Sequence, residues 1–558
     1  MKLELRIAGV VLAVGTTLSA AQSIAEPPDA IYTHGNMHTL DPDRPRAEAM
    51  AVRHGIIVAV GSNEEIKRLR GVDTQVISLH GRTVLPGLID AHGHMAGLGS
   101  YGLGLLDLSA VTDFDQLVQV VADKVATVKP GEWILGGRWD HESWPNKRLP
   151  SHERLSAVSP NNPVWLRRVD GHAGLANAAA MHAAGVNRDT PVPPGGDILR
   201  GPTGEPTGIF VDNATSLISR HAVGGSSRPE ALILKAQEMC LAVGLTGVHD
   251  AGISPSEAEV YRRLEAEGKL KIHVYAMIAA EYAVDYYADH SPYVGKRFTL
   301  RACKIVADGA MGSRGAWMLE PYADRSVDDA GKPYVGLAVT DPRRIEEISR
   351  ASLDAGFQVC THAIGDRANH EVLNIYERVL PPATRAEKRF RIEHAQLVNP
   401  SDIPRFAELG VIPSMQPTHA TTDMRWAEAR VGKRRLAGAY AWARFLQTGS
   451  RIAGGSDFPV ESHNPFYGLY AAITRMDQSG KPPGGWLPDQ RMTRTEALRA
   501  FTIDAAYAAF EEDRKGSLTP GKLADFIVID RDIMTCDLAD IPQTRVYRTV
   551  IAGETVFE

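Results

Sequence analysis

Eight short apolar runs, separated by stretches with helical periodicity, constrain the fold of this 558-residue chain more than any other feature. The eight runs span residues 84–95, 246–252, 271–279, 302–310, 357–366, 390–398, 411–419 and 451–460. Each has the length of a buried strand, and amphipathic segments such as 229–244 and 341–356 lie between them. Alternating units of this kind predict an α/β fold, a (β/α)8 TIM barrel. A doubly wound sheet is the alternative, but no GxGxxG sequence opens a helix after the first strand.

Two further parts of the chain lie outside this repeat. Residues 96–245 are too long for a simple crossover, so we predict a large insertion after the first strand. It would overhang the face where barrel active sites lie, either as a lid or substrate wall or as a packing elaboration. Short β-like runs in residues 26–85 and 505–558 predict one small β-sandwich built from both chain ends, beside a barrel domain spanning 86–504.

Metal-ligand side chains occur where several predicted strands meet the following loop. His92 and His94 are two positions apart in the first run, so both rings point to one face of the strand. His362, His394 and Asp457 end three other runs. A single histidine at a strand end is more often an ordinary core residue. A barrel, however, gathers its strand ends at one rim, where imidazoles and a carboxylate without cysteine suit a catalytic zinc-type ion.

Lys304 lies at the same predicted rim, near the end of the fourth run. Divalent cations repel an ammonium group, so two states are open for this side chain. It either stays outside the ligand shell as a solvated or salt-bridged cation, or its neutral amine captures CO2 and becomes an anionic carbamate. The field of bound cations favours the carbamate.

Taken together, the motifs carry a family resemblance. DAHGH, THAIGD, EHAQ and GSDFPV, with the lysine of CKIVADG and the terminal LTPGKLADFIVID, resemble the metal-dependent amidohydrolase superfamily. KIVADGAMGSRGAWM, VDGHAGLANAAAM and GEPTGIFVDNA are similar to its amidohydrolase-3 branch, which includes N-substituted formamide deformylases and YtcJ-type hydrolases. The resemblance covers essentially all of the chain after residue 25.

This resemblance implies two divalent metal ions, with zinc preferred. The implied ligands are His92, His94, Lys304, His362, His394 and Asp457. The first two histidines and Asp457 would hold one ion, the other two histidines would hold the second, and a carbamate on the lysine would bridge the ions. A hydroxide between them would attack a polarised carbonyl, and Asp457 would pass the proton to the departing nitrogen. The implied reaction is cleavage of the C–N bond in an N-acyl or N-formyl amine with an apolar substituent.

One departure from the superfamily pattern ranks deamination below amide hydrolysis. Deaminases of the superfamily share a glutamate three residues after the histidine of the fifth strand. In this chain that histidine is His362, and the position three residues later is Gly365. Two alternatives to amide hydrolysis stay open: a cyclic amide or ester hydrolase at the same site, and a non-catalytic regulatory protein that keeps the fold.

Three further polar residues are candidates for substrate binding. They are His172 in VDGHAG, Arg314 in GSRG and His419 in MQPTH. We predict that they orient a substrate carbonyl or carboxylate, Arg314 through two parallel hydrogen bonds. Hydrogen bonds that merely support loops are the alternative.

Charge and cysteine usage limit the expected partners. The formal net charge is −6 and no basic run suits a phosphate backbone, so we expect a small-molecule substrate and no nucleic acid. A homodimer would be indicated by an exposed apolar helix face. The cysteines are expected to stay free, since two of them fall inside predicted buried strands. They are Cys240, Cys303, Cys360 and Cys536.

The amino terminus has the pattern of a cleaved signal peptide. Residues 1–25 combine a charged start, an apolar stretch and small residues before Glu26. We therefore predict export to a periplasm-like space, with no stable membrane insertion after cleavage. An uncleaved anchor is the alternative, but glycine, serine, threonine and glutamine dilute the apolar stretch.

Overall fold

The computed structural model describes residues 26–222, 228–328 and 330–558. The predicted signal segment, residues 1–25, lies outside the described residues and stays a prediction. None of the helices in the described ranges is both long and apolar enough to cross a bilayer. Each of the four cysteines is free, and Cys240, Cys303 and Cys360 are buried, as expected.

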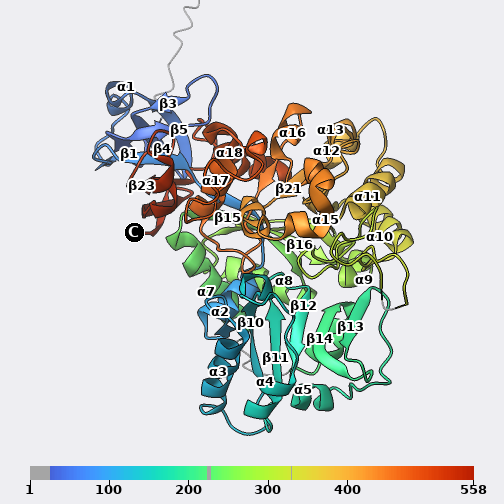
Figure 1. The fold of residues 1–558 in the computed structure, drawn as a ribbon. Helices are drawn as coiled ribbons and strands as arrows, with labels where there is room; N and C mark the ends of the chain where they lie inside the picture. Colours follow the sequence, from blue (N-terminus) through green and yellow to red (C-terminus); the bar gives the residue numbers. More distant parts are fainter. Residues whose placement is uncertain (1–25, 223–227, 329) are drawn as a thin grey trace, which may run out of the picture.

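A parallel barrel forms the centre of the molecule (Figure 1). Its strands are β8 (Leu88–Gly93), β15 (Leu245–Ile253), β16 (His273–Ala279), β18 (Phe298–Val306), β19 (Gln358–Ala363), β20 (Arg391–His394), β21 (Ile412–Met415) and β22 (Ala453–Gly454). They pair in sequence order from β8 to β22. The N–H of Asp457 donates to the carbonyl of His92 at 2.7 Å and the N–H of His94 to that of Phe458 at 2.8 Å. These bonds join the last strand to the first, so the predicted barrel is confirmed and the doubly wound alternative is wrong.

Helices cover the outside of the barrel because their sequences are amphipathic and capped. They include α7 (Pro229–Ala242), α8 (Pro255–Ala266), α9 (Ala280–Asp289), α10 (Pro342–Asp354), α11 (Asp366–Val379), α13 (Ile403–Leu409), α16 (Trp442–Gln447), α17 (Pro465–Thr474), α18 (Arg494–Ala500) and α19 (Ile503–Ala508). Helix α8 starts with a capping box between Ser254 and Glu257, followed by a proline that fits the first turn. In α10, Ile345 and Ile348 face the core at helical spacing. Most strand residues are buried, because helices cover the outer face of the barrel and side chains fill its inside.

The two chain ends share a pair of sheets at one corner of the molecule (Figure 1). One sheet has the order β5-β4-β1-β6 and the other β25-β24-β23-β7-β2-β3. The strands are β1 (Ala30–Thr33), β2 (Asn36–His38), β3 (Arg46–Ala47), β4 (Ala49–Arg53), β5 (Ile56–Gly61), β6 (Gln75–Ser78), β7 (Thr83–Pro86), β23 (Phe526–Ile529), β24 (Val546–Ile551) and β25 (Glu554–Phe557). Tyr32, Met50, Phe526 and Val550 pack into one core, so residues from both ends complete a common hydrophobic centre.

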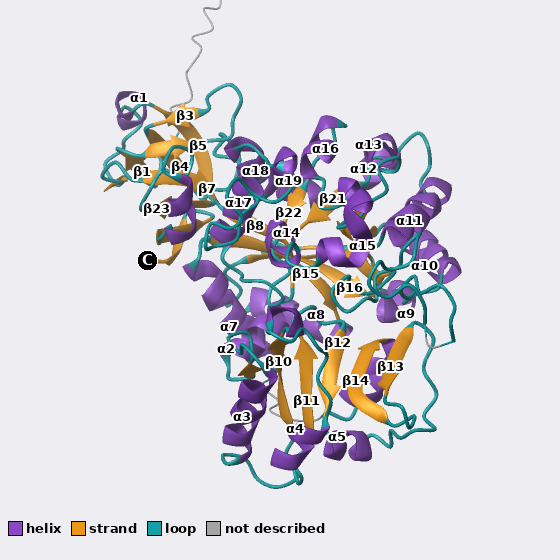
Figure 2. Ribbon diagram, in the orientation of Figure 1, coloured by secondary structure: helices purple, strands orange, loops and turns teal. Residues whose placement is uncertain are grey.

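Between β8 and β15, the chain forms a separate sheet on the other side of the barrel (Figure 2). Its order is β13-β14-β12-β11-β10-β9. The strands are β9 (Leu106–Asp107), β10 (Ile134–Trp139), β11 (Val164–Arg168), β12 (Ala173–Ala176), β13 (Gly196–Arg200) and β14 (Pro206–Asp212), and the flanking helices are α2 (Met95–Gly102), α3 (Phe114–Val125), α4 (Glu153–Val158) and α5 (Ala178–Ala183). Trp139, Trp144 and Trp165 fill its own hydrophobic cores. The ends of β11 and β14 face the barrel, which lets this insertion contribute side chains to the site below.

Candidate metal centre and substrate cavity

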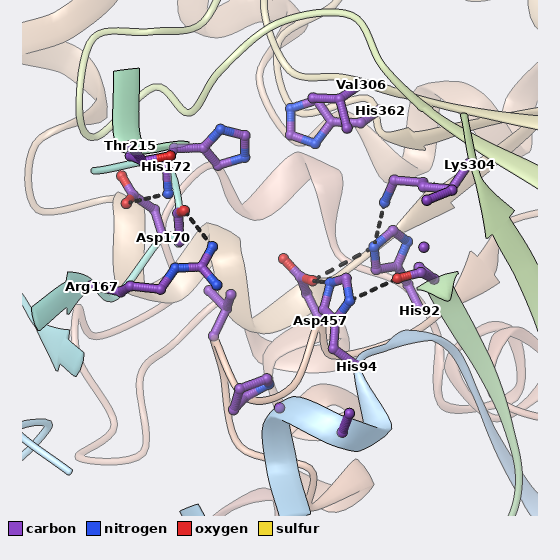
Figure 3. A pocket seen from close by; sticks show the side chains of 18 of the residues that line it. His92, His94, Arg167, Asp170, His172, Thr215, Lys304, Val306, His362 and Asp457 are labelled. Atoms are coloured by element: carbon purple, nitrogen blue, oxygen red, sulfur yellow. Dashed lines mark hydrogen bonds and ion pairs between the residues drawn. The ribbon is translucent and has the colours of Figure 1, made fainter. Parts of the chain in front are cut away.

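A cavity of about 890 Å³ lies between the carboxyl ends of the barrel strands and the insertion (Figure 3). Its lining includes all six predicted metal ligands, which are His92, His94, Lys304, His362, His394 and Asp457. They come from five different strand ends, because barrel closure brings these ends to one rim. The structure thus brings together every residue that the strand-end pattern singled out as a ligand.

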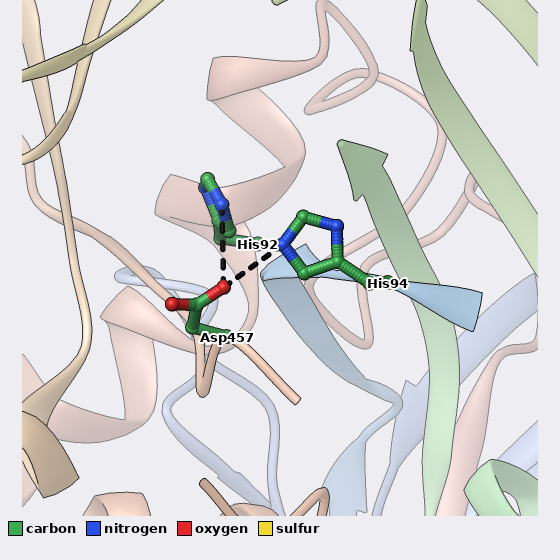
Figure 4. A group of neighbouring side chains, drawn as sticks. All are labelled: His92, His94 and Asp457. Atoms are coloured by element: carbon green, nitrogen blue, oxygen red, sulfur yellow. Dashed lines mark hydrogen bonds and ion pairs between the residues drawn. The ribbon is translucent and has the colours of Figure 1, made fainter. Parts of the chain in front are cut away.

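His92, His94 and Asp457 form one compact group of candidate ligands (Figure 4). Asp457 Oδ1 lies 3.0 Å from His94 Nε2 and 3.6 Å from His92 Nε2. The Nδ1 atoms already contact acceptors, Glu393 Oε2 at 2.5 Å for His92 and the Ala251 carbonyl at 2.9 Å for His94. With Nδ1 engaged in this way, each ring directs Nε2 toward the Asp457 carboxylate, where a metal ion can take the place of a hydrogen on Nε2. Two imidazole nitrogens and a carboxylate oxygen at these positions fit a zinc-type ion.

A second group shares the same aspartate. His394, His419 and Asp457 place ligand atoms within 4.8 Å of one another. His394 Nδ1 contacts Gln416 Oε1 at 2.8 Å, which leaves its Nε2 lone pair free. His419 Nε2 is buried without a hydrogen-bond partner and lies 3.7 Å from Asp457 Oδ2. His419, expected from the sequence to contact substrate, thus lies among the candidate ligands.

His362 stands apart from both groups, although it faces the same cavity. Its ring centroid is 4.6 Å from that of His394. Its Nε2 atom is buried without a hydrogen-bond partner, 3.4 Å from Asp308 Oδ1. An orphaned imidazole nitrogen at this depth is costly unless a ligand meets it, so His362 is also suited to hold an ion.

The backbone conformation and the protonation states of these residues both suit metal binding. His394 has φ 75° and Asp457 φ 62°, a left-handed conformation that costs a non-glycine residue about 1–3 kcal/mol. Burial lowers the pKa of His362 and His394 well below the usual value, so both rings are neutral. Burial alone would raise the pKa of the Asp457 carboxyl, but its hydrogen bond with His94 holds this pKa well below the ordinary range. The site therefore offers neutral rings and an ionised carboxylate.

Glu393 and Arg391 support His92 from inside the barrel. Both side chains are fully buried, and Arg391 Nε lies 2.7 Å from Glu393 Oε1. Burial alone would raise the pKa of Glu393, but Arg391 and His92 hold it well below its usual range. The carboxylate thereby fixes the ring of His92 with Nε2 toward the cavity. Glu393 was not among the residues expected from the sequence, where its only signal is a charge inside a strand that is buried throughout.

Lys304 is buried beside the first group. Its Nζ lies 3.0 Å from His92 Nε2, and no carboxylate of the described residues forms an ion pair with it. Burial lowers the pKa of this lysine, which favours the neutral amine. The salt-bridged alternative for Lys304 thus has no partner in the described part of the chain.

Of the two remaining candidates for substrate binding, His172 lines the cavity and Arg314 does not. His172 lines the cavity from the insertion, with Nδ1 2.6 Å from Asp212 Oδ1 and its ring 4.9 Å from that of His362. Arg314 is not among the residues that line the cavity. Its guanidinium contacts both carboxylate oxygens of Asp324, at 3.2 and 2.9 Å, and its backbone is left-handed with φ 61°. The GSRG sequence thus forms a turn in which this arginine pairs with Asp324 outside the lining of the cavity.

Comparisons with known proteins agree with this geometry. A profile described as "Amidohydrolase family" matches residues 75–557. The chain is 34% identical to "Protein LONG AFTER FAR-RED 3" of Arabidopsis thaliana, over 95% of this chain and 91% of that protein. It is 32% identical to "Putative amidohydrolase YtcJ" of Bacillus subtilis, over 95% and 99% of the two chains. It is 29% identical to "N-substituted formamide deformylase" of Arthrobacter pascens, over 95% and 98%.

A solved protein structure is similar to this chain over nearly the whole length of both chains. It is described as an uncharacterized metal-dependent hydrolase from Pyrococcus horikoshii. The TM-score is 0.72 at 25% identity, with 91% of this chain and 99% of the other covered.

Proposed function

Because the chain belongs to the amidohydrolase family, we propose that it hydrolyses the C–N bond of an N-acyl or N-formyl amine in this cavity. The observation that carries the proposal is the convergence of His92, His94 and Asp457, whose ligand atoms all lie within 4.8 Å of one another at the carboxyl ends of the barrel strands. The relative named N-substituted formamide deformylase supports the same bond type.

Side chains of this chain can perform the proton transfers that amide hydrolysis needs. When bound, zinc-type ions would act as Lewis acids toward the scissile carbonyl and the attacking water. Asp457 is held ionised, so its carboxylate accepts the proton of the water and then delivers it to the departing nitrogen. His172, fixed by Asp212, faces the cavity from the opposite wall and can hydrogen-bond the substrate.

Apolar side chains of the cavity favour an amide with an apolar substituent. These side chains are Leu105, Ile253, Val306, Val339, Ile348 and Val460. Specificity in such pockets comes from apolar walls that bury the substrate and a few polar groups that orient it.

The loop after the fifth barrel strand, β19, lacks the acid that deamination would need. A Cβ atom on Gly365 would lie 2.0 Å from the carbonyl oxygen of Trp317, so no side chain fits at this position. The neighbouring Asp366 accepts a hydrogen bond from the backbone N–H of Leu319 at 2.8 Å. Neither residue therefore offers an acid to protonate a ring nitrogen under attack.

We further propose that Lys304 carries a CO2-derived carbamate and bridges two ions. Its burial, its lowered pKa and its lack of a carboxylate partner in the described residues support this state. A crystal structure grown with zinc and bicarbonate tests it. Density for a carboxyl group on Nζ is expected, and a bare amine distant from both ions would refute the bridging role.

Metal removal tests the proposed reaction. We expect a chelator to abolish hydrolysis of a panel of N-acyl and N-formyl amines, and zinc to restore it. His94→Ala should lose bound metal and activity together, whereas His182→Ala, on the exposed face of α5, should keep both. Activity that survives complete metal removal would refute the proposal. Faster turnover of cyclic amides or esters would instead support a cyclic amide or ester hydrolase. Tight metal binding without turnover of any panel member would support a non-catalytic role.

A further inference from the structure

Within the described ranges of the chain, one arginine of the cavity wall has no acidic partner. Arg167 lies in β11 of the insertion, where neighbouring residues point to opposite faces of the sheet. The next residue, Arg168, is buried and contacts Asp140 and Asp170, each at 2.6 Å. Arg167 is exposed to the cavity instead, and no carboxylate of the described residues forms an ion pair with it.

The other arginines around the cavity are paired. Arg138 contacts Asp107 at 2.9 Å, and Arg344 contacts Glu347 at 3.1 Å. Arg168 is bound by two aspartates. Within the described part of the chain, Arg167 is thus the lining arginine whose charge is left for a ligand.

The Arg167 guanidinium is held in place rather than left mobile. Its Nη2 donates to the Gly171 carbonyl at 2.7 Å. Figure 3 shows this side chain reaching into the pocket from the wall that carries Asp170 and His172, on the side facing Asp457. The single backbone contact orients the planar group and leaves its other N–H groups for a ligand.

The charges nearby select for a carboxylate over a more highly charged anion. Glu257 and Glu281 also line the cavity and would repel a phosphate dianion more strongly than a carboxylate. A carboxylate carries one charge and matches the guanidinium fork through two parallel hydrogen bonds. An amide that bears a carboxylate could therefore reach Arg167 while its carbonyl lies at the metal ligands across the cavity.

We propose that Arg167 is the carboxylate-binding residue of the substrate site and that the substrates are amides bearing a free carboxylate. This inference rests on the proposed amide hydrolysis and narrows its substrate class. The carboxylate belongs either to the amine part, as in an N-acyl amino acid, or to the acyl part, as in the half-amide of a dicarboxylic acid. In both cases, the apolar remainder of the substrate packs against Ile253, Val306 and Val339.

Matched substrate pairs test this site in the zinc-loaded full chain. Each acid is compared with an uncharged analogue: an N-acyl amino acid with its carboxamide, and a half-amide with its methyl ester. We expect Arg167→Gln to lower kcat/KM for the acids about 10- to 100-fold, mainly through KM, and to change it less than about threefold for the uncharged analogues. The pair with the larger selective loss identifies the part of the substrate that carries the carboxylate.

Arg344→Gln is the matched control, because it removes an arginine that lines the same cavity but already has Glu347 as a partner. It should affect acids and uncharged analogues alike. Equal losses of both substrate kinds in Arg167→Gln, or a wild-type preference for the uncharged analogues, would overturn the proposal.

A binding measurement separates this inference from the proposed reaction. N-alkyl amino acids lack the scissile carbonyl, so calorimetry reports their affinity without turnover. Weaker binding to Arg167→Gln than to the wild type would support the carboxylate site even if no amide is hydrolysed, a result that would contradict only the proposed function. Unchanged binding would refute the carboxylate site whether or not amides are cleaved.

Discussion

Glu393 is a buried carboxylate that orients the metal-binding ring of His92. It contacts His92 Nδ1 at 2.5 Å and is neutralised by Arg391, and both side chains are fully buried. A carboxylate behind a metal-binding histidine fixes the ring and raises its basicity. The affinity of the site for metal therefore depends on a residue that does not touch the ion.

Replacing this carboxylate by an amide should weaken metal binding. For Glu393→Gln, we expect about 10- to 100-fold lower zinc affinity, measured by competition with a chromophoric chelator. The metal-free protein should also lose about 3–5 kcal/mol of unfolding free energy, because Arg391 would keep a buried charge without a partner. Glu377→Gln is the control, since Glu377 is exposed and pairs with Arg405 at the surface. Unaltered zinc affinity in Glu393→Gln would contradict the supporting role.

Asp250 should make the stability of the metal-free protein depend on pH. Burial raises the pKa of its carboxyl to about 6, although Tyr261 and the Met95 N–H donate hydrogen bonds to it. The folded chain keeps this proton up to about pH 6, whereas the unfolded chain releases it near pH 4. This contribution to stability is present below pH 4 and is lost as the pH rises through 6.

Asp250→Asn removes that titration and keeps an acceptor for Tyr261. The decrease in unfolding free energy between pH 4 and pH 7 should therefore be smaller in the variant by about 1–3 kcal/mol. Urea unfolding at both pH values measures it. A decrease equal to that of the wild type would show that Asp250 is ionised in the folded state.

Single residues also show what the sequence can and cannot predict. His92, His94, His362, His394 and Asp457 could be found because each ends an apolar run, a local signal. Their supporting residues carry no such signal. Glu393 meets His92 across 301 positions of the chain, and Asp212 meets His172 across 40. Those pairings depend on the closed barrel and the insertion sheet, which periodicity alone cannot align.

Among the secondary-structure elements, the barrel strands were predictable and the insertion sheet was not. Each of the eight predicted runs overlaps a barrel strand, because buried parallel strands are apolar throughout, although β18 begins four residues before its run. In the insertion, β9 has two residues and its neighbour β10 pairs in parallel, whereas β12 pairs antiparallel on both sides. Short strands with mixed pairing lack a regular alternation, so the sequence indicated an insertion without its fold.

The close contact between α2 and α7 positions the first-strand ligands. A Cβ atom on Gly99 would lie 1.9 Å from the Leu232 carbonyl oxygen, part of a helix backbone that cannot move locally. His94 directly precedes α2, so a shift of this helix would also move a metal ligand.

Gly99→Ala should therefore destabilise the protein by about 1–3 kcal/mol or more and weaken zinc binding. Gly102→Ala in the same helix is the control. Its Cβ would meet the flexible side chains of Lys235 and Met239, and alanine favours a helix by up to about 1 kcal/mol. Thermal unfolding and zinc titration compare the two variants. Equal stability of both would mean that the helices separate more easily than their packing implies.

Across the whole molecule, buried ion pairs join the insertion to the barrel. Arg430 in α15 (Ala427–Arg435) of the barrel pairs with Glu142 of the insertion and with Asp324. The side chains of Arg430 and Glu142 are almost fully buried. The insertion supplies Arg167 and His172 to the cavity, whereas all candidate metal ligands come from the barrel. Loosening this connection should therefore affect substrate binding more than metal binding.

Arg430→Met tests the connection because it leaves Glu142 buried without its partner. We expect a loss of about 3–5 kcal/mol in unfolding free energy, faster proteolysis within residues 96–245, a higher KM and unchanged zinc content. Arg434→Met is the control, since Arg434 lies in the same helix but pairs with Glu320 at the surface, where the change should stay within about 1 kcal/mol. Adding Glu142→Leu to Arg430→Met should recover much of the stability, because the unpaired charge is then gone. If the double variant is no more stable than Arg430→Met, the loss comes from packing and not from the unpaired carboxylate.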